Sequence, residues 1–225
     1  MTGPAPRIRA WDLPTRIFHW ALATLVVCSF TTGTIGGEWM AWHLRSGYAI
    51  LTLVVYRLAW GLVGSDTARF ARFLRGPRSV ARYVRLTFAG RHPPGAGHNP
   101  LGGWMVAAML AALAFQAATG LFSDDEIATQ GPLAVKVSNA LVSRMSHLHD
   151  LGRWIVAGLA VLHVAAIAVY RLAWGVRLAG AMVTGWMEVP AGTPQPRIRS
   201  AAWAAILLAA AAAAVYALVE IYPMR

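Results

Sequence analysis

Apolar residues recur along this chain in five long runs, and each run is close to the length that a helix needs to cross a bilayer. A helix needs about 20 mostly apolar residues to span the hydrocarbon core. The runs cover roughly residues 17–36, 39–64, 100–122, 146–174 and 201–222. The pattern therefore predicts an all-α integral membrane protein with five transmembrane helices.

The ends of these runs add local signals. Asn99 and Pro100 stand where the third helix would begin; Asn is a preferred N-cap and Pro suits the first helical position. Residues 133–145 form an amphipathic stretch that predicts a short separate helix. The first run has a basic lead like that of a signal peptide, but the TTGTIGG after it lacks a convincing cleavage site. We therefore expect the first run to be retained as a helix.

The distribution of charge orients the predicted helices. The chain is 57% hydrophobic and 13% charged, against about 25% charged in ordinary globular domains. Its formal net charge is +11, and the arginines gather before the first run, between the second and third, and between the fourth and fifth. Basic segments in alternate connections are typical of cytoplasmic loops, which predicts a cytoplasmic N-terminus and a C-terminus on the outer side of the membrane. The charge comes without a nucleic-acid-reading motif, which argues against nucleic-acid binding.

Four histidines lie in or at the edge of the apolar runs, where an ionisable side chain is costly and usually functional. They are His19, His43, His149 and His163. At about 100° and 1.5 Å per residue, His149 and His163 lie within about 40° of one helix face and roughly 21 Å apart along it. His147 lies about 160° from His163, nearly on the opposite face. The fourth run therefore presents two histidines at two levels of a bundle.

The expected depth of each histidine pairs it with a partner. His19 and His163 fall in the cytoplasmic half, and His43 and His149 fall toward the periplasmic side. Each pair could supply two axial imidazoles to one haem iron, which leaves no open coordination position and suits electron transfer. Zinc is disfavoured, because the two levels are too far apart for one ion and the core offers no Cys or carboxylate beside them. The rival interpretation is a haem-free protein with interfacial or core histidines. It requires the four histidines to fall at two matching depths by coincidence.

Other residues add candidates or exclude a chemistry. Cys28 is the single cysteine and C-x-x-C-H does not occur, which excludes covalent c-type haem attachment. The hexapeptide Tyr-Arg-Leu-Ala-Trp-Gly occurs at 56–61 and 170–175, and its arginines either anchor helix ends at the membrane interface or pair with haem propionates. We interpret His92 and His98 as solvated residues that could also contact a quinone headgroup. The candidates for propionate contact are Arg16, Arg45, Arg57, Arg153 and Arg171.

Four stretches of the chain resemble the prokaryotic cytochrome b561 family, which includes the b-type cytochrome subunits of nickel–iron hydrogenases. They are WDLPTRIFHW (11–20), WHLRSGYAILTLVVYRLAWGLVG (42–64), GHNPLGGWMV (97–106) and the helix of His149 and His163. The resemblance implies a four-helix transmembrane bundle over residues 17–174 that holds two b haems, one on His19 and His163 and the other on His43 and His149. Outside this bundle we expect a cytoplasmic arm, a cytoplasmic linker and a fifth helix, over 1–16, 175–200 and 201–222.

The resemblance also implies a function. Family members carry electrons across the membrane between the quinone pool and a periplasmic redox partner, which is either a c-type haem protein or a hydrogenase. The run ARFARFLRGPRSVARYVR resembles stand-alone members associated with periplasmic c-type haem proteins, which favours such a partner. The chain would then be an electron-transfer protein or quinone oxidoreductase subunit of the bacterial inner membrane, in contact with membrane lipid and with its C-terminus in the periplasm. The sequence leaves open whether it forms homo-oligomers.

An alternative function is that of a superoxide oxidase, which passes electrons from superoxide to ubiquinone. A cationic outer surface would steer this anion to its site. The loops expected on the outer side carry Glu38, Asp124, Asp125 and Glu126. The acidic charge disfavours the alternative.

Overall fold

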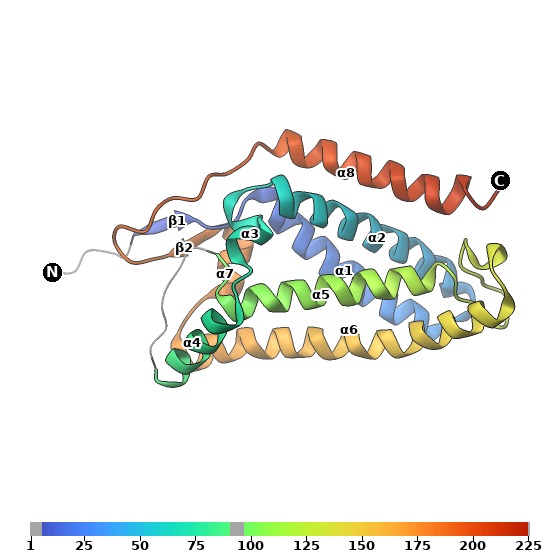
Figure 1. The fold of residues 1–225 in the computed structure, drawn as a ribbon, viewed down its shortest axis with the longest axis horizontal. Coiled ribbons are helices and arrows are strands. Elements are labelled where there is room, and N and C mark those ends of the chain that lie inside the picture. The colour runs from blue at the N-terminus through green and yellow to red at the C-terminus, as the bar shows by residue number, and fades with distance from the viewer. Residues whose placement is uncertain (1–5, 91–96, 225) are drawn as a thin grey trace. The chain divides into compact units, whose positions relative to one another are not determined.

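Five long helices dominate the chain in the computed structural model, which describes residues 6–90 and 97–224 (Figure 1). They are α1 (Leu13–Ile35), α2 (Met40–Val63), α5 (Pro100–Gly120), α6 (Asn139–Trp174) and α8 (Ala201–Tyr216). Helix α8 continues into one π-helical segment, Ala217–Ile221. Within the described residues these helices are long and apolar enough to cross a membrane, which confirms the predicted all-α membrane fold.

Helix α1 begins four residues before the apolar run that predicted it. Asp12 precedes the first helical residue, and its Oδ1 accepts a hydrogen bond from the Thr15 backbone N–H at 2.6 Å. A side-chain oxygen that binds the N3 amide is the usual arrangement of an N-cap. Asp12 is fully buried, so the cap lies inside the protein rather than in solvent. The helix therefore starts where a polar cap allows it, and not where the apolar pattern begins.

Asn99 caps α5 as the sequence predicts, whereas the start of α6 differs from the prediction. Asn99 Oδ1 accepts a hydrogen bond from the Gly102 backbone N–H at 2.7 Å. Helix α6 begins at Asn139, and residues 134–136 form only a 3-10 turn. The separate helix predicted over 133–145 is therefore wrong. The second half of that stretch is part of α6. The Ser138 carbonyl, just before the helix, accepts hydrogen bonds from the backbone N–H groups of Leu141 and Val142.

Short elements occupy the connections, and the apolar pattern did not predict them. The connection after α2 holds α3 (Phe70–Phe73) and α4 (Pro77–Phe88). Strand β1 (Arg7–Arg9) pairs antiparallel with β2 (Trp186–Glu188), which follows α7 (Leu178–Thr184). The 3-10 turns are Gly37–Trp39, Asp66–Ala68 and Ala134–Lys136. His92 lies outside the described residues.

The chain divides into two compact units, and several helices contribute to both. Unit 1 comprises Met1–Ile17, Leu58–Ala108 and Leu162–Ala204, and unit 2 comprises Phe18–Arg57, Met109–Val161 and Ala205–Arg225. In unit 1, Ala10, Trp11 and Ala181 form a buried cluster against Met182 and Met187. In unit 2, Ile50, Val54 and Leu113 form a core between α2 and α5. A second cluster in unit 2 packs the end of α8 against the connection after α5 and consists of Leu121, Leu133, Val215 and Val219.

Candidate functional site

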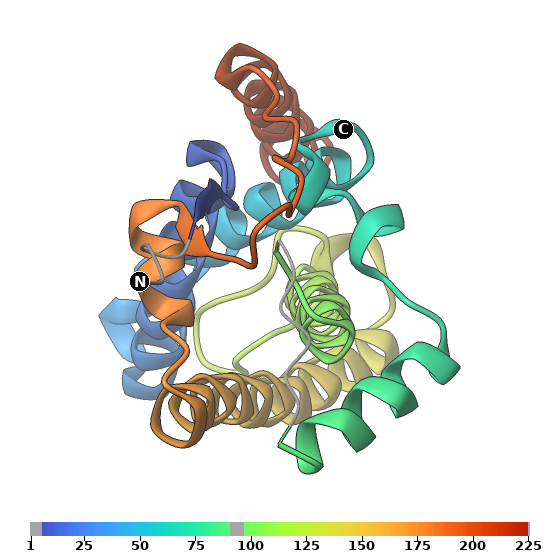
Figure 2. The same cartoon turned by 90° about the vertical axis from the view of Figure 1, so that its left-hand side faces the viewer.

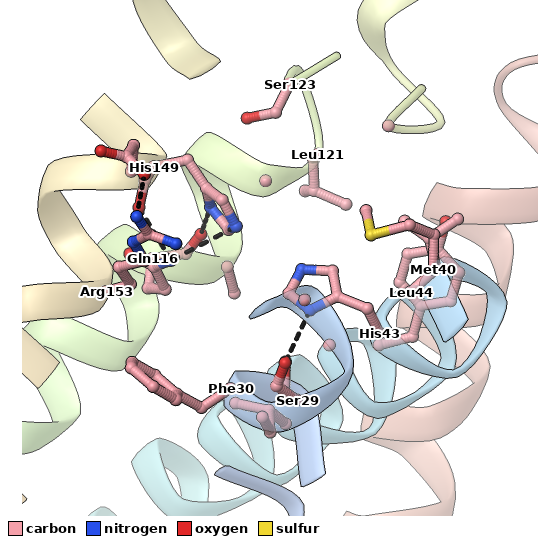
Figure 3. A pocket seen from close by; sticks show the side chains of 18 of the residues that line it. Ser29, Phe30, Met40, His43, Leu44, Gln116, Leu121, Ser123, His149 and Arg153 are labelled. Atoms are coloured by element: carbon pink, nitrogen blue, oxygen red, sulfur yellow. Dashed lines mark hydrogen bonds and ion pairs between the residues drawn. The ribbon is translucent and has the colours of Figure 1, made fainter. Parts of the chain in front are cut away.

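A cavity of about 350 Å³ lies within unit 2. Its walls come from α1, α2, α5, α6 and the loop after α5. Ligand-binding pockets are typically about 300–1,000 Å³, so the volume is that of a site rather than a packing defect. Figure 3 shows His43 and His149 reaching this cavity from α2 and α6. The structure therefore brings together the two histidines that the sequence assigns to the periplasmic level.

The His43 side chain is fixed from helix α1. Its Nδ1 lies 2.8 Å from the Ser29 carbonyl oxygen and 3.3 Å from the Ser29 hydroxyl. A carbonyl only accepts, so Nδ1 carries the proton and Nε2 keeps its lone pair. One turn after Ser29 in α1, Gly33 leaves room for the ring, because a Cβ there would come within 2.6 Å of Nδ1. His43 therefore rests on a carbonyl and a glycine four residues apart.

His149 repeats this arrangement on helix α5. Its Nδ1 lies 2.9 Å from the Gln116 carbonyl oxygen, and a Cβ on Gly120 would come within 2.8 Å of its Cε1. Gln116 and Gly120 are again four residues apart on one helix. The Gln116 side-chain amide donates to the His149 carbonyl oxygen at 3.0 Å and lies 3.3 Å from His149 Nε2. An amide N–H at Nε2 requires that nitrogen to accept, so the contacts agree on a proton at Nδ1.

The two imidazoles fit a haem iron. Histidines that bind a metal usually donate their other N–H to a backbone carbonyl or carboxylate, which fixes the tautomer, and both rings do so here. Their ring centroids are 5.9 Å apart. Metal–nitrogen bonds are about 2 Å long, so two rings at this separation could both reach one metal ion. Two protein ligands suffice for a metal whose macrocycle supplies the others, whereas structural zinc takes four.

One part of the cavity lining is polar and acidic, and we call this part the mouth of the cavity. Arg153 Nη2 pairs with Asp150 Oδ1 at 2.8 Å, and both residues line the cavity. In the loop after α5, burial favours the neutral Asp125 carboxyl, but hydrogen bonds from the backbone N–H groups of Thr129, Ile127 and Ala128 outweigh it and lower the Asp125 pKa to about 2. Asp125 is therefore ionised at neutral pH. The other polar residues of the mouth are Ser123, Asp124, Thr129 and Ser146.

The other two predicted ligands belong to different units. His19, in unit 2, is half-buried and lies edge-on to Trp20 with ring centroids 5.0 Å apart. His163, in unit 1, is half-buried on α6, whereas its neighbours Leu162 and Val164 are exposed by 55% and 63%. His163 therefore occupies the inward side of its helix turn. The pairing of His19 with His163 stays a prediction.

The five candidate arginines occupy different surroundings. Arg153 lines the cavity, and Arg57 is buried in unit 2 at 3% exposure. Arg45 is exposed and stacks on Trp42. In unit 1, Arg16 donates to the Met182 and Val183 carbonyls, and Arg171 donates to the Gly175 carbonyl. Arg153 is thus the candidate that the structure places at the two-histidine cavity.

The residues that support the two histidines were not predicted from the sequence; they are Ser29, Gly33, Gln116 and Gly120. Gly33 and Gly120 were a usable signal, because a glycine inside an apolar helical run often marks a close approach of another group. The carbonyls themselves gave no signal, since every residue has one.

Comparison with known proteins places most of the described bundle in one family. The model of the prokaryotic cytochrome b561 family matches residues 10–185, which include α1 to α7 and stop before α8. Neither a curated protein nor a solved structure matches the chain.

Proposed function

This chain belongs to the prokaryotic cytochrome b561 family, and on that premise we propose that it carries electrons between the quinone pool and a periplasmic redox partner, a c-type haem protein or a hydrogenase. Family membership makes it a multi-pass membrane cytochrome that binds b haem and transfers electrons. The finer assignments below are proposals: two haems, the ligands, the quinone, the partner and the inner-membrane orientation.

The observation that carries the proposal is the matched pair of His43 and His149. Both rings donate Nδ1–H to a carbonyl and both residues line one cavity, so they would hold the outer haem through Nε2. The Gln116 side-chain amide would then have to release His149 Nε2. Held by His43 and His149, the haem would supply one-electron transfer chemistry. The chain orients the imidazoles through Ser29 and Gln116. Apolar residues of the unit 2 core, such as Ile50 and Leu113, limit access of water from the bundle side.

We also propose a second haem, held by His19 and His163, because each of these histidines shares a helix with a residue of the first site. His19 shares α1 with Ser29, and His163 shares α6 with His149. Arg153 is our first candidate for a propionate partner, because it lines the cavity and its guanidinium can bind a carboxylate bidentately. Arg16, Arg45, Arg57 and Arg171 are the further candidates.

The haem content of histidine variants tests this assignment. We expect the purified full chain to hold two haems, His43→Ala and His149→Ala each to lose the outer one, and His19→Ala and His163→Ala each to lose the inner one. The matched control is His147→Ala, because His147 is exposed on the same helix. Haem per chain and the reduced-minus-oxidised spectrum are the measurements. Two full haems in His149→Ala, or equal loss in His147→Ala, would overturn the assignment.

The charge at the cavity mouth ranks the superoxide oxidase alternative second. Asp124, Asp125 and Asp150 line the cavity, and among the described lining residues Arg153 is the arginine that opposes them. Negative charge at a site entrance lowers the encounter rate of an anion such as superoxide. Rapid reduction of quinone by superoxide, catalysed by the purified protein, would reverse this ranking.

A further inference from the structure

The whole net charge of the chain resides in unit 1. This unit contains fourteen arginines against three carboxylates, a net charge of +11, whereas unit 2 has six basic and six acidic residues. Of the three carboxylates, Asp12 is fully buried at the start of α1, and Asp66 pairs with Arg69 and Arg72. The arginines of unit 1 therefore lack enough acidic groups on the chain itself to balance them.

Helix α4 concentrates three of these arginines on one face. Arg78, Arg82 and Arg85 are all exposed, and at about 100° per residue they fall within about 60° of the helix circumference. Val80 and Tyr83 lie on the opposite side, and Tyr83 is buried. Among the residues that the structure describes, no ion pair involves any of the three arginines. The face is thus a preformed set of unneutralised guanidinium groups.

The apolar side of α4 is anchored within unit 1, which fixes where the arginines point. The Tyr83 and Tyr170 hydroxyls are 2.6 Å apart, and Asn99 Nδ2 donates to the Tyr170 hydroxyl at 3.0 Å. Trp104 Nε1 donates to the carbonyl of Arg75, just before the helix. Figures 1 and 2 both show α4 beside the last turns of α6. The arginine face is therefore turned away from α6.

The position of α4 between two membrane spans brings this face to a bilayer surface. The connection begins after α2 ends at Val63 and stops before α5 begins at Pro100, so it starts and finishes at the same side of a membrane. Phe88, 88% exposed, ends the helix, as an aromatic side chain at the boundary of headgroups and acyl chains would. A basic helix at this level would meet the phosphates of the lipid headgroups.

We propose that Arg78, Arg82 and Arg85 form a binding surface for the headgroups of anionic phospholipids. Arginine presents a planar fork of donors that matches phosphate oxygens, and clustered basic residues beside a transmembrane helix attract anionic lipid. The lipid phosphates supply the negative charge that unit 1 lacks. The surface also orients the chain, since α4 stays on the leaflet where its arginines are neutralised.

Lipid titration of the full chain tests the proposal. The haem-loaded protein in mild detergent is titrated with phosphatidylglycerol or phosphatidylcholine, and bound lipids are counted by native mass spectrometry. We expect tighter binding of phosphatidylglycerol, and a loss of at least about tenfold in its affinity in R78Q/R82Q/R85Q, because each arginine near an anionic surface contributes several-fold. The R78K/R82K/R85K variant keeps the charge and retains most of the preference. An unchanged visible spectrum shows that the variants are folded.

The matched control removes three exposed charges elsewhere. R7Q/R9Q/R144Q lowers the net charge equally, and none of its positions lies on α4. Equal loss of phosphatidylglycerol binding in this control would overturn the proposal, because net charge alone would then explain the preference. Equal affinity of the unmodified chain for the two lipids would also overturn the proposal. An acidic protein surface would then be the better candidate to bind the arginine face.

Discussion

The two histidines of the cavity depend on glycines that give them space. At Gly33 and Gly120, a Cβ would lie 2.6 Å from His43 Nδ1 and 2.8 Å from His149 Cε1, which is closer than van der Waals contact allows. The imidazole must therefore move if either glycine gains a side chain. Sequence reasoning found the histidines, because ionisable residues in apolar runs are rare, but it could not find their supports.

We expect Gly33→Ala and Gly120→Ala each to lower the occupancy or shift the spectrum of the outer haem alone. Overpacking of this kind usually destabilises a protein by about 1–3 kcal/mol. Gly158→Ala on α6 is the control, since a Cβ there meets nothing within 4 Å. Haem content and thermal unfolding are the measurements. An effect of Gly158→Ala equal to those of the other two would show that helix propensity, and not the imidazole contact, is responsible.

At the scale of elements, the membrane spans were predictable and the short elements were not. A single apolar run of this length can pair all its backbone N–H and C=O groups within lipid only by forming a helix. Hydropathy therefore predicts α1, α2, α5, α6 and α8. Helix α4 and the β1–β2 pair depend on contacts with distant segments, such as Tyr83 with Tyr170 and Arg7 with Glu188. Pairings of this kind leave no periodic signal. The early start of α1 did leave one, because Asp12 precedes a proline-containing first turn.

The Asp12 cap is testable as an element-level prediction. We expect Asp12→Ala to lower the free energy of unfolding by about 0.5–2 kcal/mol, because the Thr15 N–H loses its acceptor at a buried helix start. Asp12→Asn keeps an oxygen at this position and should retain most of the stability. Thermal unfolding in detergent measures both. If Asp12→Asn is as damaging as Asp12→Ala, the charge of Asp12 rather than its capping bond stabilises α1.

At the scale of the whole molecule, helix α8 stands apart from the haem-binding family. The family match ends at residue 185, and the described cavity lining comes from α1, α2, α5, α6 and the loop after α5, without a residue of α8. Helix α8 still contributes packing, since Val215 and Val219 bury against Leu121 and Leu133. Helix α8 thus reaches the cavity only indirectly among the described residues, through Leu121, which lines it.

Removal of residues 201–225 should therefore leave haem content and the visible spectrum unchanged while lowering the unfolding temperature. Loss of two buried valines and their neighbours removes apolar burial worth about 1.5–3 kcal/mol for each fully buried side chain, so the stability effect is measurable. The V215A/V219A variant is the milder control and should lower stability without truncating the chain. The prediction would be wrong if truncation removed the outer haem while V215A/V219A kept it. Helix α8 would then support the cavity and would not be a mere addition to the bundle.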